Sequence, residues 1–350
     1  MAPRRAAVYP DARMPAVRSL FVSLGMVIAS CEGTHGDLGQ STGASGGGGA
    51  STSSSAGAGG EGGTGGATPI EEPDLPDRLT LVHGSPDRDA VQFCFFEWPS
   101  RENGVLLPTQ PLAFAEAHAI SAPAMILNVA VELEVVVLAG DLEAVEGDSC
   151  EDIVESPPLG VDAASLGVLP ADTFASMRSL ALAVTGCFGT EESESSEAGC
   201  GPGYGPDTPT VFPVIAPLSR LTTPSKIGFS VLHASSGFNA LDVRIVASME
   251  GAQPVSIATQ VPRGAALPFP PNIVLSSATL GAPNGASLRA NSFGSAGEVM
   301  VSMQAALSNG SLASFDNGDN YVLVALGANP EAPSGFWSPF TFVVLRADPQ

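Results

Sequence analysis

The stretch LTLVHGSPDRDAVQF, residues 79–93, places His83, Ser85 and Asp87 at alternating positions. These residue types could form a catalytic triad, in which histidine takes the proton of a serine nucleophile and a carboxylate orients the imidazole. Three residues at i, i+2 and i+4 of one strand or turn do not generally converge on one reacting atom. The structural alternative is that the histidine ends a strand and Ser-Pro-Asp forms a turn held by side-chain hydrogen bonds to backbone. We favour the strand and turn.

A second copy of the pattern supports this choice. The stretch FSVLHASSGFNALDV, residues 229–243, aligns with the first stretch at an offset of 150 residues. It keeps the histidine and the serine as His233 and Ser235, but Gly237 stands at the position of the aspartate. LALAVTG and YVLVALG occupy corresponding places near the end of each half. A triad is not expected twice with its acid missing once, so the sequence predicts an internal duplication and no catalytic residue here.

The segments that position these residues are predicted to be strands. Short apolar runs with period-two alternation follow one another after residue 76, including SLALAVTG, LDVRIVASM, EVMVSMQAAL and FTFVVLRA. In AMILNVAVELEVVVLAG, Glu132 and Glu134 alternate with apolar residues, which predicts a solvent face rather than a glycosidase carboxylate pair. LAFAEAHAI is the best helix candidate. The pattern predicts an all-β chain with two tandem immunoglobulin-like β-sandwich domains, residues 77–222 and 223–350.

The amino-terminal segment has the features of an export signal. Arginines precede the apolar run SLFVSLGMVIA, which is too short to cross a bilayer, and we expect residues 1–30 to be a lipoprotein signal peptide starting at Met1 or Met14. Ile28-Ala29-Ser30-Cys31 resembles the lipobox of bacterial lipoproteins, which implies that Cys31 is acylated and becomes the first residue of the mature chain. A soluble secreted protein with an incidental cysteine is the alternative. Residues 31–76, rich in Gly and Ser, are predicted to be a disordered tether.

The remaining four cysteines fit an oxidising compartment, where they would form two disulfides. Cys187 and Cys200 flank an acidic, serine-rich stretch, so we predict that they pair, and Cys94 with Cys150 follows by elimination. No C-x-x-C is present, which argues against a zinc site and a thioredoxin-like redox pair.

The charge balance restricts the partners. The chain has 36 acidic and 14 basic residues and a formal net charge of −22. Such a surface repels phosphate backbones, so nucleic acid is not an expected partner. Cations, basic proteins or plain solubility remain as explanations of the acidity.

A family resemblance rests on the same motif. LVHGSPDRDAVQF resembles the opening of a bacterial domain family of unknown function, V-H-A-S-P-D-A-P-x-V-D-V, which occurs often in tandem in secreted and envelope proteins. Here Gly84 stands for the first alanine, Arg88-Asp89 for Ala-Pro, and Gln92 for the aspartate. The second copy keeps His233-Ala234-Ser235 and Leu241-Asp242-Val243 but lacks Pro-Asp. The resemblance implies an immunoglobulin-like sandwich and an envelope location, and it carries no activity.

Several weaker candidates have competing interpretations. Asp316 and Asp319 in FDNGDNY could bind calcium, but Asn-Gly also signals a hairpin turn, which we favour. His118 has no second histidine at ligand spacing. Trp98 and Trp337 could stack on sugars, although burial in a core is the better prediction. The acidic stretch TEESESSE, residues 190–197, is expected to be a solvated loop.

The leading hypothesis is a non-enzymatic, lipid-anchored protein of the cell envelope, at the outer membrane or cell surface. No cofactor is predicted, its partners would be the membrane and an envelope protein or glycan, and the oligomeric state is open. The alternatives are a secreted hydrolase or sugar-acting enzyme with a site assembled from distant loops, and a calcium-dependent adhesin. A deep pocket lined by converging Asp, Glu or His would favour the enzyme.

Overall fold

The computed structural model of the chain describes residues 77–347, apart from 172, 177–178, 190–196, 202, 206–208, 221–222, 250, 270, 272, 293–296 and 330–337. The predicted signal peptide, the acylation candidate Cys31, the predicted tether and Trp337 lie outside the described residues. Most of the acidic stretch predicted as a loop lies outside them too.

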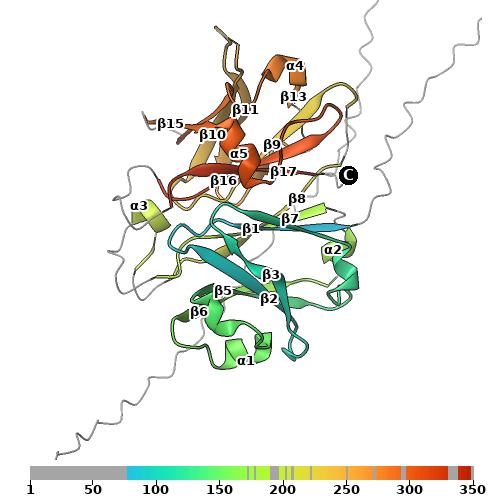
Figure 1. Cartoon of the computed structure of the whole chain (residues 1–350), viewed down its shortest axis with the longest axis vertical. Coiled ribbons are helices and arrows are strands. Elements are labelled where there is room, and N and C mark those ends of the chain that lie inside the picture. The colour runs from blue at the N-terminus through green and yellow to red at the C-terminus, as the bar shows by residue number, and fades with distance from the viewer. Residues whose placement is uncertain are drawn as a thin grey trace, which may run out of the picture. The chain divides into compact units, whose positions relative to one another are not determined.

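The first half of the described chain is a sandwich of two four-stranded sheets (Figure 1). The strand order is β4-β1-β7-β8 in one sheet and β3-β2-β5-β6 in the other. β1 and β7 are parallel, and the other neighbours are antiparallel. The strands are β1 (Arg78–His83), β2 (Ala90–Glu97), β3 (Val105–Ala113), β4 (Ala117–Ser121), β5 (Leu133–Gly140), β6 (Val161–Leu169), β7 (Ser179–Thr185) and β8 (Phe212–Pro217).

The second half repeats this arrangement. Its sheets have the orders β12-β9-β16-β17, with β13 also pairing with β9, and β11-β10-β14-β15, and β9 runs parallel to β16. The strands are β9 (Ile227–His233), β10 (Ala240–Val246), β11 (Val255–Pro262), β12 (Ala266–Leu267), β13 (Ile273–Leu275), β14 (Ser287–Ser292), β15 (Glu298–Ser302), β16 (Asn320–Leu326) and β17 (Thr341–Arg346). The β-sandwich prediction is confirmed, and LALAVTG and YVLVALG lie in the equivalent strands β7 and β16.

The described helices are short and connect the strands. They are η1 (Pro123–Met125), η2 (Leu142–Val145), α1 (Cys150–Glu155), α2 (Thr173–Ser176), α3 (Glu197–Cys200), α4 (Ser277–Leu280) and α5 (Met303–Asn309). Two sequence predictions are wrong here. LAFAEAHAI contributes to β3 and β4 instead of a helix, and EVMVSMQAAL divides into β15 and α5. The buried side chains Met303, Ala306 and Leu307 have helical spacing, which explains why the alternation stops where α5 begins.

Each sandwich has its own apolar interior, and a third apolar layer lies between the two sandwiches. In this layer the outer face of β1, β7 and β8 packs on the outer face of β9, β16 and β17 (Figure 1). Consequently β1, β7, β9 and β16 are buried on both faces, which explains their nearly continuous apolar sequences. The layer includes Val82, Ala181, Ala183, Val214, Ala216, Leu218, Leu232, Ala234, Val322, Val324, Leu326, Val343, Leu345 and Ala347.

Polar contacts across this layer occur in reciprocal pairs. Ser179, at the start of β7, donates its hydroxyl to the carbonyl of Ala347 at 3.1 Å. Asn320, at the equivalent start of β16, donates its amide to the carbonyl of Ser219 at 3.0 Å. The two sandwiches therefore meet in an arrangement close to that of a two-fold symmetric dimer, within one chain.

The ends of β7 and β16 also contact the opposite sandwich at equivalent places, one through a hydrogen bond and the other through an apolar side chain. The Thr185 hydroxyl donates to the carbonyl of Ala234, and at the equivalent place Leu326 packs against Gly84. A Cβ added to Gly84 would lie 2.5 Å from Leu326 Cδ2 and 2.9 Å from the Val184 carbonyl oxygen. Glycine at this position leaves the space that the leucine occupies.

The outer face of the sheet β3-β2-β5-β6 is covered as well. η2 and α1 pack on it, and the predicted Cys94–Cys150 disulfide joins β2 to α1. Glu134 on β5 is therefore only 2 % exposed, and the predicted solvent face is wrong at this residue although it holds at Glu132. The carboxylate accepts hydrogen bonds from Arg101 at 2.5 and 2.6 Å and from Ser165 at 2.9 Å.

The second predicted disulfide, Cys187–Cys200, is confirmed too. Both cysteines are buried and pack with Tyr204. The disulfide fixes the segment that follows β7.

Replacing Gly84 with alanine should destabilise the fold, because the new methyl group overlaps Leu326 and a backbone carbonyl. We expect Gly84→Ala to lower the free energy of unfolding by about 1–3 kcal/mol and to cost less in a Leu326→Ala background. Gly297→Ala is the control, since a Cβ there meets no atom within 4 Å. Urea denaturation of the wild type, the two single variants and the double variant measures the coupling between residues 84 and 326. Equal effects of Gly84→Ala in both backgrounds would contradict the packing of Leu326 on Gly84.

Candidate functional site

The residues considered as a catalytic triad form a strand end and a turn instead. His83 is fully buried at the end of β1, and its Nε2 lies 3.0 Å from the carbonyl oxygen of Arg88. Ser85 Oγ lies 2.6 Å from the Gly186 carbonyl oxygen and 2.8 Å from Asp87 Oδ1, so these acceptors share its single proton. Within the described residues no hydrogen bond joins Ser85 to the imidazole. The predicted strand end and turn are confirmed.

The second copy holds its residues in the same way. Ser235 donates its hydroxyl to the carbonyl of Gly327 at 2.6 Å, and Gly327 is the equivalent of Gly186. His233 is fully buried, and its Nδ1 accepts a hydrogen bond from the Ser235 backbone N–H at 3.3 Å. In both copies the serine thus ties the turn after the first strand to the end of the parallel strand beside it.

The structure also explains why the second copy lacks the aspartate. A Cβ added to Gly237 would lie 2.1 Å from the backbone nitrogen of Asn329. No side chain fits there without moving the backbone. The loss of the acid is therefore a packing requirement.

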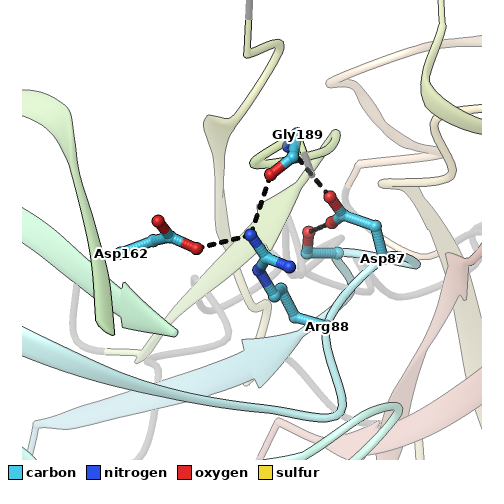
Figure 2. Close-up of polar contacts among 5 residues, drawn as sticks. Asp87, Arg88, Asp162 and Gly189 are labelled. Atoms are coloured by element: carbon cyan, nitrogen blue, oxygen red, sulfur yellow. Dashed lines mark hydrogen bonds and ion pairs between the residues drawn. The ribbon is translucent and has the colours of Figure 1, made fainter. Parts of the chain in front are cut away.

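In the first copy the acid and its neighbour hold the segment after Cys187. Asp87 Oδ2 accepts the backbone N–H of Gly189 at 3.0 Å (Figure 2). The Arg88 guanidinium donates to the Gly189 carbonyl at 2.9 Å and to Asp162 at 2.5 Å, and it lies 5.4 Å from the centre of the Phe188 ring. Both charged side chains are engaged in structure.

Two further motif residues have a structural role that the sequence analysis missed. Gln92 lies where the register between β2 and β3 shifts, and its amide donates to the carbonyls of Pro108 at 3.1 Å and Thr109 at 3.3 Å. Asp242 lies at the equivalent shift between β10 and β11, and its carboxylate accepts the Gln260 N–H at 2.7 Å. In each copy a polar residue stands between two apolar residues of the strand, and this pattern could have indicated a residue with a structural role. At a bulge it satisfies backbone groups that the ladder leaves unpaired.

The calcium candidates Asp316 and Asp319 both face Arg346. Asp319 also accepts a hydrogen bond from the Tyr321 hydroxyl at 3.3 Å. Burial raises the pKa of the Asp319 carboxyl, and the Arg346 charge opposes this shift. A protein guanidinium thus stands beside the carboxylates, and no group of three or more His, Cys, Asp or Glu in the described part of the chain could hold a metal ion. The predicted hairpin is also wrong, because this turn leads from the loop after α5 into β16.

The remaining single-residue candidates lie on the surface. Trp98 is 40 % exposed, so its predicted burial in a core is wrong. His118 is exposed on β4. The Trp98 backbone N–H donates to the carbonyl of Glu132 at 2.9 Å.

A groove lies between the two sandwiches. Its main cavity has a volume of about 480 Å³, which is in the range of ligand sites, and β3, β4 and the carboxyl end of α5 line it. A second cavity of about 230 Å³ shares Ala117, His118 and Ser311 with the first. We call the two together the inter-sandwich groove. The main cavity is lined by Pro108, Thr109, Gln110, Pro111, Leu112, Glu116, Ala117, His118, Ser308, Asn309 and Ser311.

The main cavity contains one carboxylate, Glu116, and one imidazole, His118, and the smaller cavity is lined by Arg78 and Arg346. Glu116 accepts the backbone N–H of Ala113 at 3.0 Å. No described hydrogen bond links the imidazole to a serine of the groove. The lining of the main cavity also offers hydroxyl, amide and backbone groups.

Comparisons with known proteins give a limited result. No family model matches the chain, and no curated protein matches it. Among solved structures, the chain is similar to an adhesin-like protein from Bacteroides ovatus, with 10 % identity over 78 % of this chain and 95 % of that one. The TM-score is 0.19, so this similarity carries no argument about function. None of the described helices has the length and apolar character needed to span a membrane.

The buried histidines should make the fold sensitive to acid. Burial lowers the pKa of His83 to about 4, and burial together with the Arg263 charge lowers the pKa of His233 to about 3. The unfolded chain therefore binds more protons below about pH 6.5, and stability falls as the pH falls. From pH 7 to 5 each histidine should remove about 2 kcal/mol from the free energy of unfolding.

Urea denaturation at the two pH values tests this expectation. His83→Gln should reduce the pH dependence by about half, whatever its effect at pH 7. His118→Asn is the control and should leave the pH dependence unchanged because this side chain is exposed. An unchanged dependence in His83→Gln would show that other groups cause the acid sensitivity.

Proposed function

We propose that this chain is a non-enzymatic, lipid-anchored protein of the bacterial envelope that binds a partner through the inter-sandwich groove. The observation that carries the proposal is that the three residues considered as a catalytic triad all form part of the strand end and turn. His83, Ser85 and Asp87 are hydrogen-bonded within the fold, and the second copy repeats the arrangement without the acid. The main cavity of the groove, in contrast, contains a single carboxylate, Glu116, and the smaller cavity is lined by Arg78 and Arg346.

The case for export rests on the cysteines. Two disulfides form and persist in oxidising compartments and are rare in the cytosol. The lipobox-like Ile28-Ala29-Ser30-Cys31 supports lipid attachment at Cys31. Two or three acyl chains would anchor the protein stably, where a single chain would be marginal.

The rigid contact between the sandwiches favours binding as the role of the groove. Its walls come from β3 and β4 of the first sandwich and α5 of the second, so its shape depends on the apolar layer between them. A preformed site avoids the ordering entropy that binding would otherwise require. The tether predicted for residues 31–76 would separate the lipid anchor from the sandwiches that form the groove. This arrangement fits a binding protein of the envelope.

Lipid attachment is tested by expressing the full chain in a bacterium fed with an alkyne fatty acid. We expect the wild type to be labelled and to fractionate with membranes, because acylation of the Cys31 thiol provides the anchor. Cys31→Ser should be unlabelled and soluble. Ser30→Ala keeps a small residue beside the cysteine and should remain labelled, and labelling of Cys31→Ser would contradict the assignment.

Binding at the groove is tested by photocrosslinking in intact cells. With His118 replaced by p-benzoylphenylalanine, discrete conjugates with a partner are expected, because this exposed position lines both cavities. The same replacement at Leu159, which is fully exposed and lines neither cavity, is the control. Conjugates of equal yield at both positions, or none at position 118, would argue against the groove as a binding site.

A further inference from the structure

One edge of the first sandwich is left open inside the inter-sandwich groove. β4 is the last strand of its sheet, and no described strand pairs with its outer edge. On its inner edge β4 is antiparallel to β1, with Leu79 opposite Ile120 and Leu81 opposite His118. The unused hydrogen-bonding groups of β4 therefore lie on the side that faces away from β1.

The register shows which backbone groups these are. The Ala122 N–H donates to the Asp77 carbonyl at 2.6 Å, and the His83 N–H donates to the Glu116 carbonyl at 3.2 Å. In an antiparallel pair, residues bonded to the neighbour alternate with residues whose N–H and C=O point away from it. The even-numbered residues of β4 thus bond to β1. The backbone groups of Ala117, Ala119 and Ser121 point outward.

Both cavities of the groove border β4. Ala117 lines both cavities of the groove, and Ala119 lines the smaller one. Both side chains are methyl groups, which let a second backbone approach closely. The groove therefore combines an unsatisfied strand edge with room next to it.

Two comparable edges are blocked or covered. β3, the adjacent edge, carries Pro108 and Pro111, which have no N–H to offer. In the second sandwich, β12 and β13 both pair with β9 at the place equivalent to β4. β4 contains no proline, lysine or arginine that would discourage pairing. An edge of this kind is a template for strand addition by another chain.

We propose that an extended, basic segment of a partner protein adds to β4 as a further strand of the sheet β4-β1-β7-β8. The proposal rests on the proposed function of the groove and names the kind of partner that the groove takes. Backbone hydrogen bonds to Ala117, Ala119 and Ser121 hold the segment.

The charge of the segment follows from the charge around the groove. The main cavity contains the carboxylate of Glu116 and no arginine or lysine. The smaller cavity is lined by Arg78 and Arg346, and Arg346 forms ion pairs with Asp316 and Asp319. The whole chain has a net charge of −22, which attracts cationic partners and repels acidic ones at long range. A basic side chain of the segment lies opposite Glu116.

The test uses random decapeptides displayed on phage and selected on the full chain. Enriched peptides should carry basic residues and alternate β-branched with polar residues. Their dissociation constants are then measured by titration calorimetry against the wild type and two proline variants. Ala119→Pro removes an outward N–H and adds a ring at the proposed contact, so binding should weaken at least tenfold.

Met300→Pro is the matched control on the edge strand β15. The Met303 N–H donates to Ala286 at 3.1 Å, so by the same alternation the Met300 N–H points away from β14. Its side chain is 67 % exposed, and the residue lines neither cavity of the groove. Peptide binding should change less than twofold in this variant. Glu116→Gln should weaken the basic peptides severalfold at low salt and little at high salt.

Amide hydrogen exchange on the wild type gives a test that needs no variant. Bound peptide should slow exchange at Ala117, Ala119 and Ser121 at least tenfold, with little change at His118 and Ile120, whose N–H groups already bond to β1. Contact through side chains alone would not produce this alternation.

Three results would overturn strand addition: no enriched peptide, equal binding to Ala119→Pro and wild type, or no alternating protection. The photocrosslinking experiment separates this failure from that of the proposed function. If conjugates at position 118 persist when Ala119→Pro is added, the groove binds a partner by another mode. A neutral glycan as occupant would give that outcome. If conjugates are absent from the start, both proposals fail.

Discussion

The apolar layer between the sheets β4-β1-β7-β8 and β12-β9-β16-β17 is the contact on which the rest of the structure depends. It buries β1, β7, β9 and β16 on their second face, so these strands tolerate few polar side chains. The Ser179 and Thr185 hydroxyls, which lie at this layer, donate to carbonyls of the opposite sandwich. Since burying an unpaired hydroxyl costs free energy, these bonds specify one alignment of the two halves. The same alignment forms the groove.

The histidine–serine motif is explained by the same burial of the sheets on both faces. In each copy it stands where the first strand leaves the doubly buried sheet and the backbone must turn without solvent to satisfy it. Ser85 and Ser235 supply hydrogen bonds to the ends of the neighbouring parallel strands, and the buried imidazoles fill the corner behind them. A motif with catalytic residue types is thus explained by packing and backbone satisfaction.

Sequence reasoning succeeded where a single segment contains the cause. Alternation and turn residues gave the strands, the order of blocks gave the duplication, and the stretch between Cys187 and Cys200 gave the disulfides. It failed where the cause is tertiary. Glu134 alternates like a surface residue, yet α1 and η2 cover its face of the sheet, and Arg101 compensates the buried charge. The groove could not be predicted because its walls, such as Glu116 and Asn309, are distant in the sequence.

The difference between Gly84 and Ala234 has a consequence for how copies of the molecule meet. The two outer faces are alike enough that a sandwich could in principle dock onto its own counterpart in another molecule. If two second sandwiches paired, Leu326 would meet the methyl group of Ala234, at the spacing that excludes a Cβ from Gly84. A leucine that requires glycine opposite it therefore disfavours the pairing of two second sandwiches.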